Sequence, residues 1–363
     1  MEKRLMSVCL SAILTLGVVL WDYTAQAASL VEIIEGAKKE GTVSVKFLSG
    51  VNPKSMERLR REVREKFGTD LKILPTPTGD FQKDLTQAIM EYKAGATPSY
   101  DLMTLGPEHV VPGFKAGIFE KVAWSSLLPK EASPCVIVNL PPYGEVGMSY
   151  YTSYGGLMYN PEKIPAGETP KTLDDLAAPK FKGKVGIYDY PDVWAARAFI
   201  MGKDRVLPQL RAILKNGAIK GKFVDLLNRY LLGEISIAVI STPFFKMAQD
   251  KGKPVEWQNI EYIDEKVRPL VLRKGAQHPN AATLLAIHLT SPQGAKFMLE
   301  ESGSGNACYP GNWAYDIKIK GKEQGIPIIS SDKLTKAIEF YESEEYVKWT
   351  KEIKLIFDTG GER

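Results

Sequence analysis

Short apolar runs alternate with helical patterns along most of this chain, and this alternation restricts the fold more than any other feature. The runs TVSVKFLSG and LKILPTPTG are typical of strands, and between them Met56, Leu59 and Val63 recur at helical spacing. Strands and helices in alternation are typical of parallel sheets covered by helices on both faces. We therefore predict an α/β protein.

The same pattern continues further along the chain. Asp80 stands where the N-cap of a helix that stops near Gly95 is expected, and YDLMTLG then predicts a third strand. KVGIYDY and ISIAVIST predict further strands, each followed by a helix. In open α/β sheets ligands bind beyond the carboxyl ends of the strands, so the residues that follow these strands are candidate ligand contacts.

The N-terminus predicts export. Lys3 and Arg4 precede an apolar run from Leu5 to Leu20, which ends near the small-residue pattern Ala25-Gln26-Ala27. This is the pattern of a secretory signal peptide, and the run is shorter than the roughly 20 apolar residues that span a bilayer. We expect cleavage of residues 1–27, which leaves a soluble periplasmic protein.

The remaining chain exceeds the roughly 250 to 300 residues that one hydrophobic core serves, so two domains are expected. The net charge of +4 is spread over mixed-sign segments, which argues against nucleic acid as a partner. Beyond the signal peptide the cysteines are Cys135 and Cys308. In an oxidising compartment they can pair, and two buried thiols are an equal alternative.

Three stretches resemble characteristic segments of the iron(III)/thiamine/polyamine-type substrate-binding proteins of bacterial ABC importers. They are LLGEISIAVISTPFFKMAQDKGKPVEW, KGAQHPNAATLLAIHLTSPQGAKFMLEESG, and YGGLMYNPEKIP with PKTLDDLAAPKFKGKVGIYDYP. The resemblance implies a two-lobed periplasmic-binding-protein type II fold, in which each lobe is a central sheet flanked by helices. It also implies two crossing strands as a hinge, and a permease and an ATPase as membrane partners.

The extended runs SYGGLMY and VRPLVLR suit the two crossing strands, because neither has helical periodicity. This placement divides the chain into segments. We expect 29–147 and 267–330 to form lobe 1, 148–266 to form lobe 2, and 331–363 to be a C-terminal helical tail. Which lobe the tail packs on stays open.

The resemblance also bears on the ligand. Iron-binding members of the family carry adjacent tyrosines just after the strand ISIAVIST, where this chain has Phe244 and Phe245. Phenylalanine offers no oxygen to iron(III). We therefore expect a small organic ligand and no cofactor or metal. Ferric iron remains the alternative, since Tyr150 and Tyr151 form an adjacent pair elsewhere.

The candidate ligand contacts have roles that follow from residue type. Hydroxyls, glycine backbone and carboxylates come from strand ends, while Trp194 and Phe245 are expected as aromatic walls. Arg197 suits a carboxylate or phosphate, or an interdomain salt bridge. Asp80, Glu108 and Asp189 suit an ammonium, so the sign of the ligand's charge stays open. The full set is Ser49, Gly79, Asp80, Thr104, Gly106, Tyr154, Asp189, Trp194, Arg197, Thr242 and Phe245.

Enzyme and sensor functions are the other classes to weigh. The chain has three histidines, His109, His278 and His288, and lacks G-x-S-x-G, H-E-x-x-H, Walker A and C-x-x-C motifs. We therefore expect a monomeric binding protein and not an enzyme. A ligand-presenting partner of a chemoreceptor or sensor kinase would use the same cleft.

Overall fold

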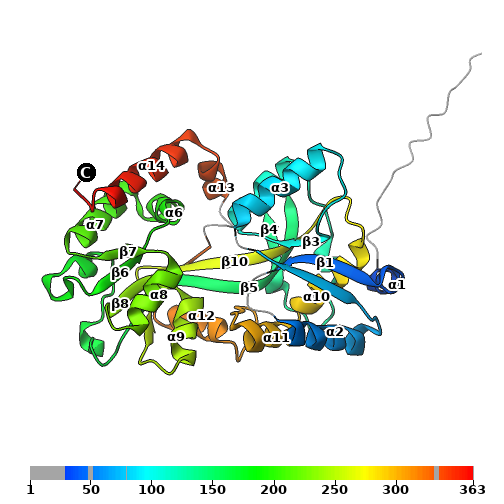
Figure 1. Cartoon of the computed structure of the whole chain (residues 1–363), viewed down its shortest axis with the longest axis horizontal. Coiled ribbons are helices and arrows are strands. Elements are labelled where there is room, and N and C mark those ends of the chain that lie inside the picture. The colour runs from blue at the N-terminus through cyan, green and yellow to red at the C-terminus, as the bar shows by residue number, and fades with distance from the viewer. Residues whose placement is uncertain (1–28, 48–51, 79, 331–334, 363) are drawn as a thin grey trace, which may run out of the picture.

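The computed structural model describes residues 29–47, 52–78, 80–330 and 335–362 (Figure 1). The predicted signal peptide and the candidate residues Ser49 and Gly79 lie outside these ranges. Within them, no helix combines the length and the apolar character needed to cross a membrane.

Helices cover more of the described chain than strands do. The first lobe's sequence begins with a capping box, in which Ser29 and Glu32 satisfy each other's backbone N–H groups. The helices are α1 (Leu30–Glu40), α2 (Pro53–Phe67), α3 (Phe81–Lys93), α4 (Pro107–Lys115), α5 (Trp124–Leu127), α6 (Pro191–Met201), α7 (Lys203–Lys215), α8 (Phe223–Leu231), α9 (Thr242–Asp250), α10 (Pro279–Leu289), α11 (Pro292–Ser302), α12 (Trp313–Glu323), α13 (Thr335–Tyr341) and α14 (Glu344–Asp358).

The strands form one hydrogen-bonded network in the order β2-β1-β3-β10-β5-β8-β6-β7, with β4 and β9 paired to β5 and β11 paired to β10. They are β1 (Thr42–Phe47), β2 (Lys72–Pro77), β3 (Leu102–Thr104), β4 (Ile137–Leu140), β5 (Gly144–Tyr159), β6 (Val185–Tyr188), β7 (Ile219–Gly221), β8 (Ile237–Ser241), β9 (Glu256–Gln258), β10 (Ile263–Leu272) and β11 (Ile328–Ile329). The predicted α/β class and the strands expected from TVSVKFLSG to ISIAVIST are confirmed.

Two long antiparallel strands, β5 and β10, run between the two halves of the molecule (Figure 1). On one side β10 pairs with β3, and on the other β5 pairs with β8. β1 is parallel to β2 and β3, and β6 is parallel to β7 and β8. The expected segment boundaries, 147/148 and 266/267, fall inside β5 and β10.

The pairing directions make the carboxyl ends of the strands in the two lobes face each other. Because β10 is antiparallel to both β3 and β5, β3 runs in the direction of β5, whereas β8 runs against it. The end of β3 is level with Met148 and the end of β8 is level with Gly155. At about 3.3 Å per residue, the two edges are about 23 Å apart along β5.

Each lobe has its own hydrophobic core. One large cluster draws its buried residues from 157–260 and from the tail. Another draws them from 33–151 and then from 270–298, so the chain leaves this lobe and returns to it. Ile353, Ile356 and Phe357 of α14 are buried in the first of these clusters. The tail therefore packs on lobe 2, against α6 and α7 (Figure 1).

A disulfide joins Cys135 to Cys308, with the two Cα atoms 5.6 Å apart. It ties the segment before β4 to the loop that follows α11, and both belong to the lobe that contains β1–β4. Of the two alternatives left open by the sequence, the structure has the pair. A disulfide is typical of proteins that fold in an oxidising compartment.

Candidate ligand-binding site

A small pocket of about 70 Å³ lies between the lobes, over β10. Both lobes and the tail contribute to its lining. The lining residues are Glu108 from α4, Asp192, Val193 and Ala196 from α6, Lys266 and Arg268 from β10, and Tyr341 and Tyr346 from the tail. Because it joins both lobes to a crossing strand, this pocket is the candidate site.

Glu108 is the acidic residue that lobe 1 contributes. Its Oε1 lies 3.3 Å from His109 Nδ1. Burial disfavours the charged carboxylate, but the contact with His109 and the positive charges of Arg268 and Lys266 outweigh burial and lower the pKa of Glu108 to about 2. Glu108 is therefore a fixed negative charge at the pocket.

Asp192 faces the pocket from the first turn of α6 in lobe 2. Asp192 keeps part of its surface exposed to solvent. Desolvation and the nearby charge of Glu108 raise the pKa of Asp192, and Lys266 offsets part of this effect. Two carboxyl groups, one from each lobe, thus line the same pocket.

Arg268 gives the floor of the pocket a positive charge. Its guanidinium lies over the ring of Phe81, 5.6 Å from the centroid, and donates one hydrogen bond to the backbone oxygen of Val267. Across the described ranges no carboxylate comes within salt-bridge distance of it. The pocket therefore offers charges of both signs to a ligand.

Aromatic side chains cover the carboxyl ends of the strands in lobe 2. Phe223 lies between Tyr190 and Phe244, with ring centroids 4.9 and 5.1 Å away. Lys222 lies over the ring of Tyr190 at 4.4 Å. These three aromatic residues follow β6, β7 and β8, and each is partly exposed. They form an aromatic wall that the sequence analysis had assigned to other residues.

The predicted contacts from lobe 1 lie at the strand ends as expected. Asp80 is the N-cap of α3 and accepts a hydrogen bond from the backbone N–H of Lys83. Thr104 ends β3, and its buried hydroxyl has no hydrogen-bond partner within the described part of the chain. Gly106 is the N-cap of α4, where a Cβ atom would overlap the Glu108 carboxylate. Glycine therefore allows Glu108 to lie over the start of its own helix.

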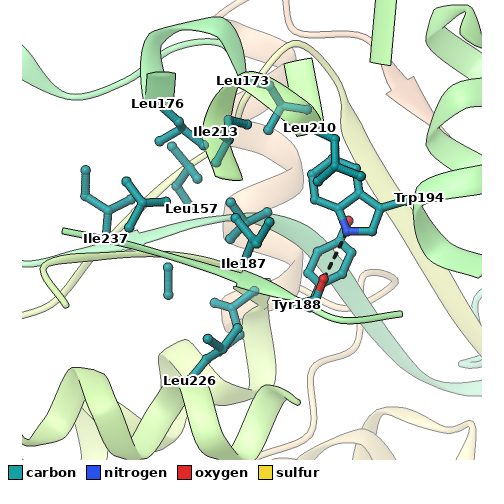
Figure 2. Packing of buried hydrophobic residues seen from close by; sticks show 14 of the residues in the cluster. Leu157, Leu173, Leu176, Ile187, Tyr188, Trp194, Leu210, Ile213, Leu226 and Ile237 are labelled. Carbon is teal, nitrogen blue, oxygen red and sulfur yellow. Dashed lines mark hydrogen bonds between the residues drawn. The ribbon is translucent and has the colours of Figure 1, made fainter. Parts of the chain in front are cut away.

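Trp194, Tyr154 and Thr242 are fully buried, which differs from the expected contact roles. Trp194 donates a hydrogen bond from Nε1 to the backbone oxygen of Tyr188 and packs in the core of lobe 2 (Figure 2). The hydroxyl of Thr242 accepts the backbone N–H of Tyr154. The short apolar helix PDVWAARAFIM turns Trp194 inward because most of the helix surface is covered.

Arg197 is paired within lobe 2. Its guanidinium makes an ion pair with Glu261 and lies 5.0 Å from the ring centroid of Tyr262. Arg205 binds the other oxygen of Glu261 at 2.6 Å. Of the alternatives considered for Arg197, the structure has a salt bridge, and it lies within one lobe and not between two.

Asp189 and Phe245 lie at different places. Asp189 follows β6, and its backbone oxygen accepts a hydrogen bond from Lys222. Phe245 lines a separate cavity of about 360 Å³ beside Trp257 and α12. A cavity of about 430 Å³ lies on lobe 1 between α2 and β2, so it does not join the lobes.

Of the eight residues that line the pocket, Glu108 alone was named from the sequence as a candidate contact. Lys266 and Arg268 alternate along a crossing strand, a pattern that places them on one face, and Asp192 follows a proline at the start of a helix. These signals were available. Nothing in the sequence located Tyr346, because its position depends on where the tail packs.

Within the described ranges, no group of three or more His, Cys, Asp or Glu side chains is placed to hold a metal ion. His278 and His288 each pair with a buried carboxylate of lobe 1, Asp101 and Glu62.

Two lobes with facing strand ends, two crossing strands and a pocket between them define the class of two-lobed solute-binding proteins. Residues 59–308 match the family of bacterial extracellular solute-binding proteins, and the chain belongs to that family. The predicted family resemblance and solute-binding function are thereby confirmed. No curated protein sequence matches the chain.

Solved structures share the fold at low sequence identity. Iron-bound HitA from Pseudomonas aeruginosa has a TM-score of 0.62 and 18% identity, over 86% of this chain and 99% of that one. The spermidine/putrescine-binding protein PotD from Streptococcus pneumoniae has a TM-score of 0.65 and 13% identity, over 88% of this chain and 99% of that one. AfuA from Actinobacillus pleuropneumoniae, with fructose-6-phosphate bound, has a TM-score of 0.61 and 14% identity, over 86% of this chain and 96% of that one. The predicted type II fold is confirmed.

Proposed function

We propose that this protein binds a small organic ligand between its lobes in the periplasm and delivers it, as a monomer, to the permease and ATPase of an ABC importer. The observation that carries the proposal is the pocket to which Glu108, Asp192 and Arg268 contribute charges from lobe 1, lobe 2 and the crossing strand. A ligand held there contacts both lobes at once.

An organic ligand fits this site better than ferric iron. Phe244 and Phe245 stand where oxygen ligands would be needed, and the adjacent pair Tyr150 and Tyr151 is buried in the core of lobe 1. Burial raises the pKa of Tyr151 to about 12, although Arg268 favours the phenolate, so a phenolate ligand is disfavoured there. HitA, PotD and AfuA are described with different ligands, so the fold does not choose among ligands.

Closure about the crossing strands supplies the mechanism. We place the hinge in β5 and β10, with 29–147 and 267–330 as lobe 1 and 148–266 as lobe 2. A ligand that touches both lobes binds the closed form more tightly than the open one and shifts the equilibrium towards closure. Ser49 and Gly79 follow β1 and β2 in sequence, so they remain candidate contacts of lobe 1.

A thermal-shift screen tests the binding function. The panel contains matched cationic, anionic and zwitterionic compounds, namely spermidine, thiamine, fructose-6-phosphate, methylphosphonate and amino acids, together with ferric citrate. A compound that binds the native state stabilises it by about 2.7 kcal/mol at a hundredfold excess over Kd. We expect one organic class to do so and Arg268→Ala with Asp192→Asn to abolish its effect. Stabilisation by ferric citrate alone, or turnover of a panel compound, would contradict the proposal.

The thermal-shift screen does not separate importer and sensor roles, since both need the ligand. Capture of the ligand-loaded protein by permease and ATPase subunits in membranes distinguishes them. Capture by a chemoreceptor or sensor kinase in place of these subunits would favour the ligand-presenting alternative.

A further inference from the structure

The C-terminal tail spans the two lobes. α14 is anchored on lobe 2, where Ile353, Ile356 and Phe357 are buried. α13, which precedes it, contacts both α4 of lobe 1 and α6 of lobe 2. Figure 1 shows α13 between the two halves of the molecule, beside α14.

Each side of α13 has its own contacts. Towards lobe 1, Ile338 packs against the cluster that contains Val110 and Val111 of α4. Glu342, just after α13, makes an ion pair with Lys115 at the end of α4. A single seven-residue helix thus links lobe 1 to a tail that is anchored on lobe 2.

The same segment also lines the interlobe pocket. Tyr341 and Tyr346 flank the turn between α13 and α14, with ring centroids 5.6 Å apart. Asp192 and Glu108 both act electrostatically on Tyr346, and with burial they raise the pKa of Tyr346. The tail is therefore next to the two carboxylates that the lobes contribute.

We propose that the C-terminal tail is a strap that joins the lobes and closes the interlobe pocket on its third side, so that the docking of Ile338 on lobe 1 limits how far the cleft opens. The strap rests on the proposed function only in treating this pocket as the ligand site.

Matched substitutions in the unliganded full chain test the strap. Ile338→Asp places a charge at the contact with lobe 1, and Val347→Asp makes the same change at an exposed position of α14. Lys115→Glu disrupts the same contact from lobe 1, because it replaces the ion pair with Glu342 by repulsion between two carboxylates. Fluorophores on unnatural amino acids at Met90 and Leu232, both exposed, report lobe separation by single-molecule energy transfer without disturbing the disulfide.

We expect one population for the wild type and for Val347→Asp, and a second population at longer separation for Ile338→Asp and Lys115→Glu. Nitration of Tyr346 by tetranitromethane should be several-fold faster in the two opening variants. An unchanged separation in both, or equal opening in Val347→Asp, would overturn the strap. Since this readout needs no ligand, failure of the strap and failure of the thermal-shift screen are separate results.

Discussion

Phe340 of the tail stacks on Phe199 of α6, with ring centroids 4.7 Å apart and ring planes 18° from parallel. Phe340 also contacts Trp349 at 4.9 Å, one helix later. The ring is therefore held between lobe 2 and α14. Phe340 thus contacts lobe 2 and α14 two residues after Ile338, which packs on lobe 1.

Phe340→Ala should reduce the free energy of unfolding by about 2 to 3 kcal/mol, because it removes a buried ring and its aromatic pairs. Urea denaturation measures the change. Val347→Ala, at an exposed position in the same tail, is the control and should stay within about 0.5 kcal/mol of the wild type. Equal effects of the two substitutions would show that the ring adds nothing to stability.

Trp194→Ala should lower the stability of the unliganded protein by about 3 to 5 kcal/mol, since the ring is fully buried in the core of lobe 2. The thermal midpoint without ligand reports this loss. Tyr190→Ala, in the partly exposed aromatic wall, should change that midpoint much less. If the Trp194→Ala protein is as stable as the wild type, Trp194 is not a core residue and is again a candidate ligand contact.

Glu261→Gln should cost about 3 kcal/mol or more, because it leaves the buried guanidinium of Arg197 without its carboxylate. The double variant Arg197→Met with Glu261→Gln should regain at least half of that loss, since it also removes the charge. A double-mutant cycle from urea denaturation measures the coupling. Additive losses would show that the pair is not energetically coupled.

Replacing both Cys135 and Cys308 by Ala should lower stability by about 2 to 5 kcal/mol, because the bond closes a long loop in the unfolded chain. The two cysteines are 173 residues apart in sequence. Denaturation of the oxidised wild type, the reduced wild type and the double variant gives the comparison. The free energy of unfolding should be the same for the reduced wild type and the double variant.

Glu108 should make stability depend on pH. Its depressed pKa, about 2, means that its stabilising effect is complete above the ordinary value of 4.5 and is lost as the pH falls towards 2. Since its side chain is 36% exposed, we expect a loss of roughly 1 to 2 kcal/mol after solvent screening. The stability difference between the wild type and Glu108→Gln should therefore shrink between pH 6 and pH 3.

The same variant has a second, local consequence. Without the charge of Glu108, the pKa of Asp192 should fall towards its ordinary value, because one of the two effects that raise it is gone. NMR titration of the Asp192 carboxyl in both proteins measures the shift. Glu57→Gln, on exposed surface of α2, is the control and should leave Asp192 unchanged.

The fold was largely predictable because it follows from local patterns. Asp80 is the N-cap that its position before an apolar helical face predicted, and the alternation of strands and helices is the one observed. The two crossing strands were predicted from extended runs without helical spacing. These features depend on neighbours in sequence, which is what a pattern reports.

The site was less predictable because side-chain direction depends on distant contacts. Trp194 follows a strand end, as a cleft residue would, yet it points into the core beneath Tyr188. Arg197 is neutralised by Glu261, 64 residues later in the sequence. Tyr346 reaches the pocket only because α14 packs on lobe 2. No local pattern contains these relationships.

The pairing of β3 with β10 has a consequence for how the chain is made. β3 ends at Thr104, and its partner begins at Ile263, so a growing chain carries an unpaired strand edge for more than a hundred residues of synthesis. Open edges attract other strands, and slow non-local pairing prolongs their exposure. The first lobe cannot be completed until almost the whole chain is available. In this topology, completion of the first lobe waits for the return of the chain in β10 and α10.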